Sequence, residues 1–203
     1  GLGDVYKRQS QTSLGEHIKD YSFFFYNPEE ALHLSQREKA KAVECICNIE
    51  EELRHAIDCH SQILISRYIE LLLDHCNRFY ERQFITRCEA NKKIMKKTDV
   101  LLKDYILSGK LKYNTSPSLG YCAKILQLSS HYFNDLLKFE SGKNIDEYFE
   151  SKRLEMAKSM LLDSNNTVSV VTEKLGYPNI RYFSRLFKRI TGVAPNNYRL
   201  SQN

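Results

Sequence analysis

The sequence of 203 residues has no apolar stretch that approaches the roughly 20 residues of a membrane-spanning helix. It also lacks a signal peptide, so we expect a protein of the cytoplasm with no membrane partner. Hydrophobic residues at 42% and charged residues at 27% exclude an intrinsically disordered chain and are typical of folded domains. The length allows one large domain or two small ones.

Motifs of catalysis and metal binding are missing as well. The sequence contains no glycine-rich phosphate loop, no His-Glu-x-x-His pair and no nucleophile motif, which argues against an enzyme. The six cysteines include no Cys-x-x-Cys pair, so buried reduced thiols are expected rather than a metal site or a disulfide framework. His60 beside Cys59 and His75 beside Cys76 lack a third ligand and are interpreted as structural. No cofactor is predicted.

What the sequence does have is positive charge at its C-terminal end. The whole chain carries a net charge of +5. Residues 164–203 contain six basic residues and one acidic residue, so this segment carries as much net charge as the whole chain. A basic segment of this kind favours an acidic polymer as partner.

Two copies of one pattern occupy the chain from Ser118 to Tyr198. In the first copy the pattern consists of Tyr132, Phe133, Leu136, Lys138, Gly142 and Tyr148, and it recurs 50 residues later as Tyr182, Phe183, Leu186, Lys188, Gly192 and Tyr198. Upstream of these residues the offset is 49, so the copies differ by one residue in a connecting turn. A repeat that keeps its helical spacing predicts one supersecondary unit used twice.

The second copy predicts a helix-turn-helix unit. Thr167 can cap a helix from Val168 to Leu175, and Gly176 opens a sharp turn. The second helix, Ile180 to Ile190, is expected to bury Phe183, Leu186, Phe187 and Ile190 and to expose Arg181, Ser184, Arg185, Lys188 and Arg189. Exposed arginine and serine near the start of such a helix can read base edges in a major groove, whereas the lysine and arginine near its end are expected at phosphates.

The first copy carries a weaker charge pattern. Its supporting helix is expected from Leu119 to Gln127, and Ser129 or Ser130 caps a second helix that runs to Glu140. The exposed positions of that second helix are His131, Asn134, Asp135 and Lys138. Asp135 stands where Arg185 stands in the second copy, and phosphate repels an acid, so most electrostatic affinity should come from the second copy.

A long amphipathic helix, about Asn144 to Leu162, is expected between the two copies. It would hold the two recognition helices in a fixed relation. Successive major grooves on one face of DNA lie roughly 34 Å apart, so a rigid connector makes binding to two grooves feasible.

The N-terminal half is also predicted to be helical. Tyr21 to Tyr26 is an aromatic run that reads as a strand or as a hydrophobic patch, and periodicity leaves this open. Asn27 to Glu30 should start a short helix. Further helices are expected at residues 36–57, after a capping box formed by Ser35 and Glu38, at 62–82 and at 89–107.

The helix at 62–82 has two apolar stripes. One stripe follows coiled-coil spacing and consists of Ile65, Ile69, Leu72, Cys76 and Phe79. One stripe can pack on the preceding helix as an antiparallel hairpin, which leaves the other for a second subunit. We therefore expect a homodimer through this seam, and the alternative is that both stripes are buried within one chain, for example against the aromatic run.

These residues resemble the AraC/XylS family of bacterial transcription activators over about Ser118 to Arg199. The resemblance is carried by residues 129–142, by Arg153, Leu154, Ala157, Met160 and Leu161, and by residues 175–192 with Pro195, Tyr198 and Arg199. It implies an all-α domain with two helix-turn-helix units joined by a long helix, entering adjacent major grooves of promoter DNA. The sequence differs from the family at two positions. Asp135 occupies a position that is often basic or polar in the family, and Thr172 replaces the usual alanine.

By position, the resemblance implies base-reading residues at His131, Asn134, Asp135, Ile180, Arg181, Ser184 and Arg185. Phosphate contacts are expected at Ser130, Lys138, Lys188 and Arg189. The expected organisation is a leader with the remnant of a sensor domain at 1–26, a helical dimerisation and linker region at 27–109, a linker at 110–117 and the DNA-binding domain at 118–203. In longer family members a cupin sensor barrel precedes such a region, and here the barrel is expected to be missing.

The leading hypothesis is therefore a sequence-specific DNA-binding transcription regulator, an activator, acting as a homodimer in the bacterial cytoplasm and bound to the nucleoid. Its expected partners are double-stranded promoter DNA and RNA polymerase. The alternative is a helical protein-interaction module with weak or non-specific DNA binding. A DNA-repair methyltransferase with such a domain would need a reactive or zinc-bound cysteine cluster, which the sequence lacks.

Overall fold

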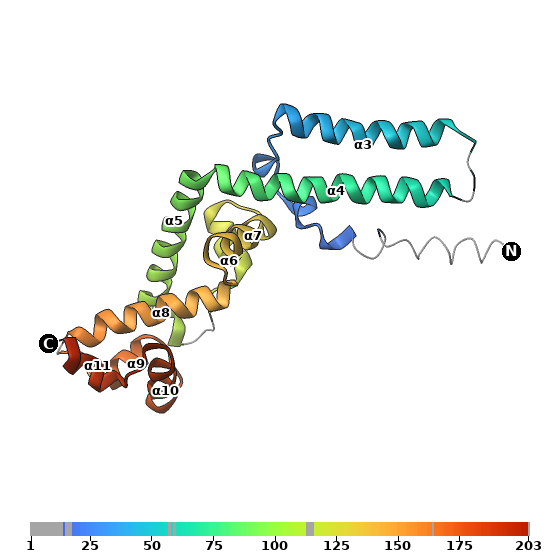
Figure 1. The fold of residues 1–203 in the computed structure, drawn as a ribbon. Coiled ribbons are helices and arrows are strands. Elements are labelled where there is room, and N and C mark those ends of the chain that lie inside the picture. The colour runs from blue at the N-terminus through green and yellow to red at the C-terminus, as the bar shows by residue number, and fades with distance from the viewer. Residues whose placement is uncertain are drawn as a thin grey trace. The chain divides into compact units, whose positions relative to one another are not determined.

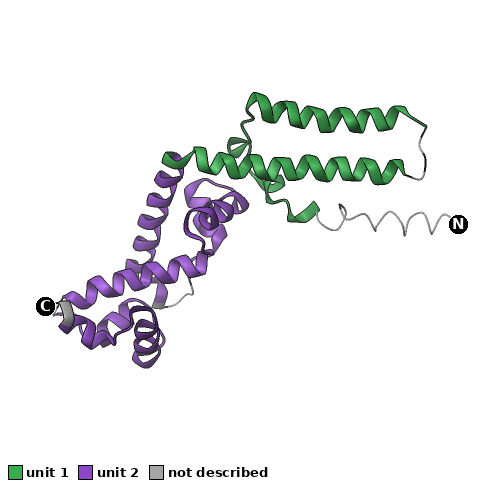
Figure 2. Ribbon diagram, viewed as in Figure 1, with its two compact units in different colours: residues 1–89 green, residues 90–203 purple. Residues whose placement is uncertain are grey.

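The computed structural model describes residues 14, 18–56, 58, 60–112, 116–163 and 165–202, and every element in these ranges is helical (Figure 1). The prediction of an all-α fold is thus confirmed. The chain forms two compact units that divide between Glu89 and Ala90 (Figure 2). Of the region expected as leader and sensor remnant at 1–26, residues 1–13 and 15–17 lie outside the described residues. Within them no helix is long and apolar enough to cross a membrane.

The first unit is a helical hairpin with short helices before it. Three 3₁₀ helices come first, η1 (Ile18–Asp20), η2 (Ser22–Phe25) and η3 (Pro28–Glu30). The long helices α3 (Gln36–Arg54) and α4 (Ser61–Thr86) then lie side by side and antiparallel (Figure 1). Helix α3 ends before its predicted end at Ile57, which lies outside the described residues, and α4 runs beyond its predicted end at Arg82.

The predicted capping box starts α3. The Ser35 side chain accepts a hydrogen bond from the Glu38 amide at 3.3 Å, and the Glu38 carboxylate accepts one from the Ser35 amide at 2.7 Å. Arg82 of α4 donates a further bond to the same carboxylate. Burial by itself raises the pKa of Glu38, but the bonds from Ser35 and Arg82 outweigh it and hold that pKa below its usual value.

The aromatic run packs on α4 as 3₁₀ helix rather than as a strand. Tyr21 is buried, and its hydroxyl donates to Asp74 at 2.9 Å. Burial, together with this carboxylate, raises the pKa of Tyr21 to about 12. The ring of Phe23 stacks on Tyr80 with centroids 5.5 Å apart. The run is therefore a hydrophobic patch whose partner, α4, belongs to the same chain.

The second unit contains the duplicated region and the helix before it. Its elements are α5 (Cys88–Leu107), η4 (Lys110–Lys112), α6 (Leu119–Leu126), α7 (Ser130–Ser141), α8 (Ile145–Leu162), α9 (Val168–Lys174), α10 (Ile180–Thr191) and α11 (Pro195–Gln202). Both copies contribute to one core, in which Phe133, Phe149, Phe183 and Phe187 are fully buried. The sequence pattern predicted all the α-helices of this unit except α11.

Helix α5 contributes to the core of the second unit. Leu102 and Ile106 of α5 are 0% and 2% exposed and pack in the same cluster as the duplicated region. The segment predicted as a linker at 110–117 is partly packed too, since Leu111 in η4 joins the core and Pro117 is buried. The division between units thus falls before most of α5 rather than in that segment.

Candidate nucleic-acid interface

The turns of the two helix-turn-helix units have the same backbone geometry. Gln127 and Gly176, which are equivalent in the repeat, adopt left-handed conformations with φ of 59° and 66°. In each turn the amide after this residue donates to a carbonyl five residues back, from Leu128 at 2.9 Å and from Tyr177 at 3.0 Å. This bond is typical of a Schellman helix end, and it fixes the direction in which the recognition helix leaves.

Thr172 fits where the first copy has alanine. Both Thr172 and the equivalent Ala123 are buried, at 4% and 1% exposure. The threonine hydroxyl donates to the Val168 carbonyl at 2.7 Å, so its polar atom is satisfied inside α9. The substitution leaves the shared turn geometry in place.

Equivalent residues also start and stop the recognition helices α7 and α10. Ser129 and Asn179 each accept a hydrogen bond from the amide three residues later, at 3.1 and 2.8 Å. Ser129, not Ser130, is therefore the cap of α7. Both helices end at a glycine, Gly142 with φ of 69° and Gly192 with φ of 82°. The duplication predicted from spacing is thus present at both ends of the recognition helices.

The outer face of α10 is basic and accessible. Its exposed residues are Ile180, Arg181, Tyr182, Arg185, Lys188 and Arg189, and Ser184 is half-buried. All the residues proposed to contact DNA from the second copy therefore lie at the surface or at its edge. Ile190 was expected in the core, and this was wrong, because its side chain is 52% exposed.

Tyr182 is a candidate contact that the sequence pattern did not indicate. It is 51% exposed, and with Arg185 and Arg189 it lines a shallow hollow of about 280 Å³. Positions 182, 185 and 189 share one helical face because they are three and four residues apart. The equivalent Tyr132 in α7 is buried at 4% exposure, so the repeat alone does not reveal this difference.

The outer face of α7 carries less accessible charge. His131 and Lys138 are exposed, whereas Ser130, Asn134 and Asp135 are half-buried. The side-chain amide of Asn134 donates to the Asp135 carboxylate at 3.4 Å, so these two predicted base-reading residues interact with each other. The first copy thus presents a neutral to acidic centre where the second presents Arg185.

Arg153 of α8 contacts the second helix-turn-helix unit. Its guanidinium donates to the Leu175 carbonyl at 3.1 and 2.7 Å and to Glu150 at 2.9 Å. It also lies over the ring of Tyr177, 3.9 Å from the centroid. The Tyr177 hydroxyl donates to Glu150 at 2.7 Å, and burial with this carboxylate raises the Tyr177 pKa. The turn before α10 is therefore bonded to helix α8.

Two further contacts brace this arrangement. Arg199 of α11 donates to the Leu161 carbonyl at the end of α8 at 2.8 Å and to the carbonyl of Asn166. The Tyr148 hydroxyl of α8 donates to Asp99 of α5 at 2.7 Å. Helix α8 is thus bonded to both α5 and α11.

The predicted dimer seam lies on α4 in the first unit. Ile65, Ile69, Leu72 and Cys76 are half-buried, whereas Phe79 is buried at 6% exposure within its own chain. The hairpin also exposes other large apolar side chains, namely Val43, Ile46 and Leu53 on α3 and Ile63, Leu64, Leu71 and Ile85 on α4.

The described cysteines are free thiols in different surroundings. Cys45 and Cys122 are buried, and burial raises the pKa of the Cys122 thiol to about 11. Cys47 and Cys88 are exposed, so the expectation of buried thiols was wrong for these two. Cys59 lies outside the described residues. Across the described ranges, no three histidine, cysteine, aspartate or glutamate side chains form a metal-binding group.

Comparisons with known proteins match part of the chain. A family model described as a helix-turn-helix domain covers residues 122–201. The helix-turn-helix-type transcriptional regulator YobQ of Bacillus subtilis is 39% identical over 77 residues, which are 38% of this chain and 32% of YobQ. The raffinose operon transcriptional regulatory protein RafR of Pediococcus pentosaceus is 34% identical over 89 residues, 44% of this chain and 32% of RafR.

Among solved structures, the C-terminal domain of the two-component response regulator YesN from Fusobacterium nucleatum is 27% identical and covers 49% of this chain and 94% of that domain, with a TM-score of 0.38. The chain spans at most 32% of the length of the first curated relatives it matches. The family model's match, residues 122–201, lies within the region of the two helix-turn-helix units and excludes the hairpin. Residues 122–201 of this chain therefore match a helix-turn-helix domain and are similar to bacterial transcription regulators of that type.

Proposed function

We propose that the chain is a sequence-specific DNA-binding transcription regulator that places α7 and α10 in adjacent major grooves. The observation that carries the proposal is the pair of identically capped helix-turn-helix units, of which one has an exposed basic face. Arg181 and Arg185 can each offer paired donors to guanine, while Lys188 and Arg189 contact phosphates. In the first copy, His131, Asn134 and Asp135 face bases, and Ser130 and Lys138 face the backbone.

The two units are proposed to contribute unequally. The four basic residues of α10 attract the phosphate backbone, so α10 supplies most of the electrostatic affinity. Asp135 in α7 is repelled by phosphate and accepts only from a base such as cytosine through its N4 amino group. Helix α7 therefore adjusts which sites are bound rather than how tightly DNA is held.

The rest of the proposed function follows from the resemblance and from the hairpin. A homodimer through the α4 seam would place two domains on one promoter, and activation through RNA polymerase is proposed on the resemblance alone. The place of action is the nucleoid in the bacterial cytoplasm. No enzymatic activity and no cofactor is proposed.

One observation favours a second candidate, a helical protein-interaction module with weak DNA binding. The half-buried Asp135, paired with Asn134, gives α7 a recognition face without the basic charge of α10. Under this alternative the chain would hold DNA weakly or only non-specifically.

A salt titration of DNA binding tests the proposal. Binding of the full chain to a random duplex is measured by gel shift, and log K should fall linearly with log salt, with a slope of about −0.9 for each phosphate contacted. Replacing Lys188 by alanine should reduce the slope by about 1, since one phosphate contact is lost. Binding that is absent, or that does not change with salt, would contradict the proposed function.

A further inference from the structure

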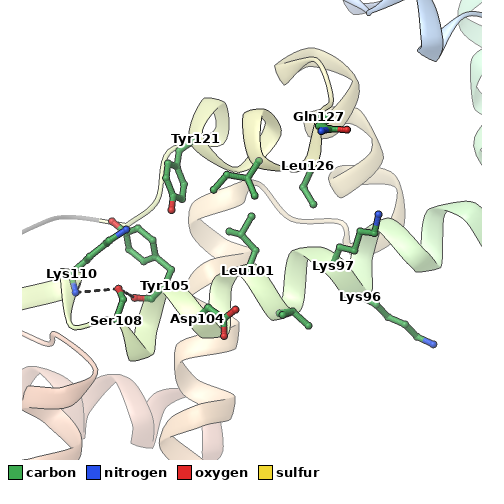
Figure 3. A pocket seen from close by; sticks show the side chains of 12 residues that line it. Lys96, Lys97, Leu101, Asp104, Tyr105, Ser108, Lys110, Tyr121, Leu126 and Gln127 are labelled. Atoms are coloured by element: carbon green, nitrogen blue, oxygen red, sulfur yellow. Dashed lines mark hydrogen bonds between the residues drawn. The ribbon is translucent and has the colours of Figure 1, made fainter.

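A groove on the second unit lies between α5 and α6, away from the outer face of α10. It has a volume of about 840 Å³ and is lined by residues of α5, of the turn after it and of α6 (Figure 3). Leu101 of α5 and Leu126 of α6 point toward one another across it. The proposed DNA contacts use none of the residues that line this groove.

Aromatic rings line one end of the groove and contact each other. Tyr105 and Tyr121 meet edge to face with centroids 5.7 Å apart. The ammonium of Lys110 lies 5.7 Å from the first ring and 5.9 Å from the second, so two cation–π contacts hold this lysine at the end of the groove.

The apolar surface continues beyond the hollow. Val100 and Ile125 line the groove, yet they are 59% and 52% exposed. These side chains are too exposed to enclose a small molecule, but they are well placed to contact a longer partner. The lining positions on α5 run from Lys96 to Tyr105, a rise of about 14 Å, which matches two to three turns of a docked helix.

Charge at the rim indicates the chemistry of that partner. Lys97 points along the opening at one end, and Lys110 lies at the other (Figure 3). Neither forms an ion pair with another residue in the described part of the chain. Against them the lining offers one carboxylate, Asp104. An apolar strip with lysines at both ends is complementary to a helix with apolar anchors and acidic ends.

We infer that the groove between α5 and α6 is a docking site for an acidic amphipathic helix of a partner protein. The helix would place apolar side chains at positions i, i+3 or i+4, and i+7 on the strip from Val100 to Ile125. Its acidic residues would meet Lys97 and Lys110. This inference is independent of DNA recognition, because the groove and α10 share no residue.

The inference is tested with a display library of helical peptides of about 14 residues, selected on the full chain. Enriched sequences should have apolar residues at that spacing and Asp or Glu at their ends. Their affinity, measured by fluorescence anisotropy, should fall at least about tenfold on the double variant Val100→Asp with Ile125→Asp. On Lys97→Glu it should fall about threefold to tenfold.

Matched controls distinguish a loss of peptide affinity at the groove from a loss caused by general changes in charge or stability. Lys103→Glu reverses a charge on another face of α5, and Leu162→Asp adds an acid at an apolar residue of α8 that is 43% exposed. Both should leave peptide affinity within about twofold. Every variant should keep the midpoint of the parent chain in thermal unfolding, which shows that it is folded without relying on the proposed DNA binding.

Several results would overturn the inference. It fails if no enriched peptide loses affinity on the groove variants, or if enriched peptides are basic or neutral at their ends. It also fails if dodecanoate binds in the groove while peptides do not, because the site would then take a small ligand. A change in the association state of the chain caused by the groove variants would instead assign the groove to a second copy.

Discussion

Gly176 and Gln127 occupy the same place in the two turns, but only Gly176 is also restricted by a close neighbour. Both have positive φ, which glycine adopts without strain and other residues adopt at a cost of roughly 1 kcal/mol. A Cβ on Gly176 would also lie 2.5 Å from the Leu111 Cβ and 3.0 Å from the Leu111 carbonyl oxygen. The second turn therefore needs glycine for space as well as for its dihedral angle.

Replacing Gly176 by alanine should lower the free energy of unfolding by about 2–4 kcal/mol, which combines the dihedral strain with overpacking against the backbone of η4. Urea denaturation measures this change. Gly192→Ala is the control, because its φ is also positive but no atom lies within 4 Å of its added Cβ. It should cost only about 1 kcal/mol. Equal losses in the two variants would contradict a steric role for Leu111.

Residue-level features of the interface were predictable only in part. The charge of α10 follows from helical spacing, so Arg181, Arg185, Lys188 and Arg189 were expected at the surface, where they lie. Ile190 was misplaced because it is apolar, although its counterpart Glu140 in the first copy already signals a surface position. Tyr132 and Tyr182 have the same identity and the same spacing, so their different burial depends on packing that no pattern encodes.

At the scale of elements, α8 determines how the recognition helices are held. Arg153 bonds the carbonyl of Leu175 at the end of α9, and it packs on Tyr177 in the turn that leads to α10. A planar guanidinium can make two parallel bonds and stack at the same time, which an ammonium group cannot. Arg153 therefore links the turn before α10 to α8, in addition to the core contacts of Phe183 and Phe187.

Arg153→Lys keeps the charge but loses the paired bonds and the stacking. The free energy of unfolding should fall by about 1–3 kcal/mol, since the Leu175 carbonyl is left without its donors. Thermal or urea unfolding of the full chain provides the measurement. Arg181→Lys is the matched control at an exposed position and should change stability by less than about 0.5 kcal/mol. A destabilisation no larger than that of the control would show that Arg153 does not fasten the turn.

Element boundaries were predicted best where a cap marks them. Ser35 and Thr167 start helices as the sequence indicated, because a side-chain oxygen that accepts an amide is a local signal. The burial of Leu111 was not predicted, since a single apolar residue in a polar segment has no periodicity. Helix α11 begins with Pro195 at its first position, a start signal that was available but was used only for the family resemblance.

At the scale of the whole chain, two units divide the proposed tasks. The second unit contains both helix-turn-helix units together with α5, whose Leu102 and Ile106 lie in the same core. The first unit is a hairpin with an unusual amount of exposed apolar surface for an isolated element. This surface supports the proposal that the hairpin carries the dimer contact.

Leu72→Glu tests that proposal. A charge in the centre of the seam should convert dimers to monomers in sedimentation velocity, because a buried unpaired carboxylate is costly at an interface. Ile85→Glu is the control, since Ile85 is 64% exposed and lies outside the proposed seam. The control should keep the association state of the parent chain. Dimers that persist in the Leu72 variant would contradict the seam.

The central claim is that the two recognition helices read DNA unequally, with α10 as the stronger contact. Selection of bound sites from a randomised duplex library tests it most directly, with the parent chain, Arg185→Ala and Asp135→Ala compared. The parent should enrich two sequence blocks centred about one helical turn, 10–10.5 base pairs, apart. Arg185→Ala should erase the more strongly specified block, and Asp135→Ala should alter the other only mildly. A motif that survives Arg185→Ala, or that is lost in Asp135→Ala, would contradict this account.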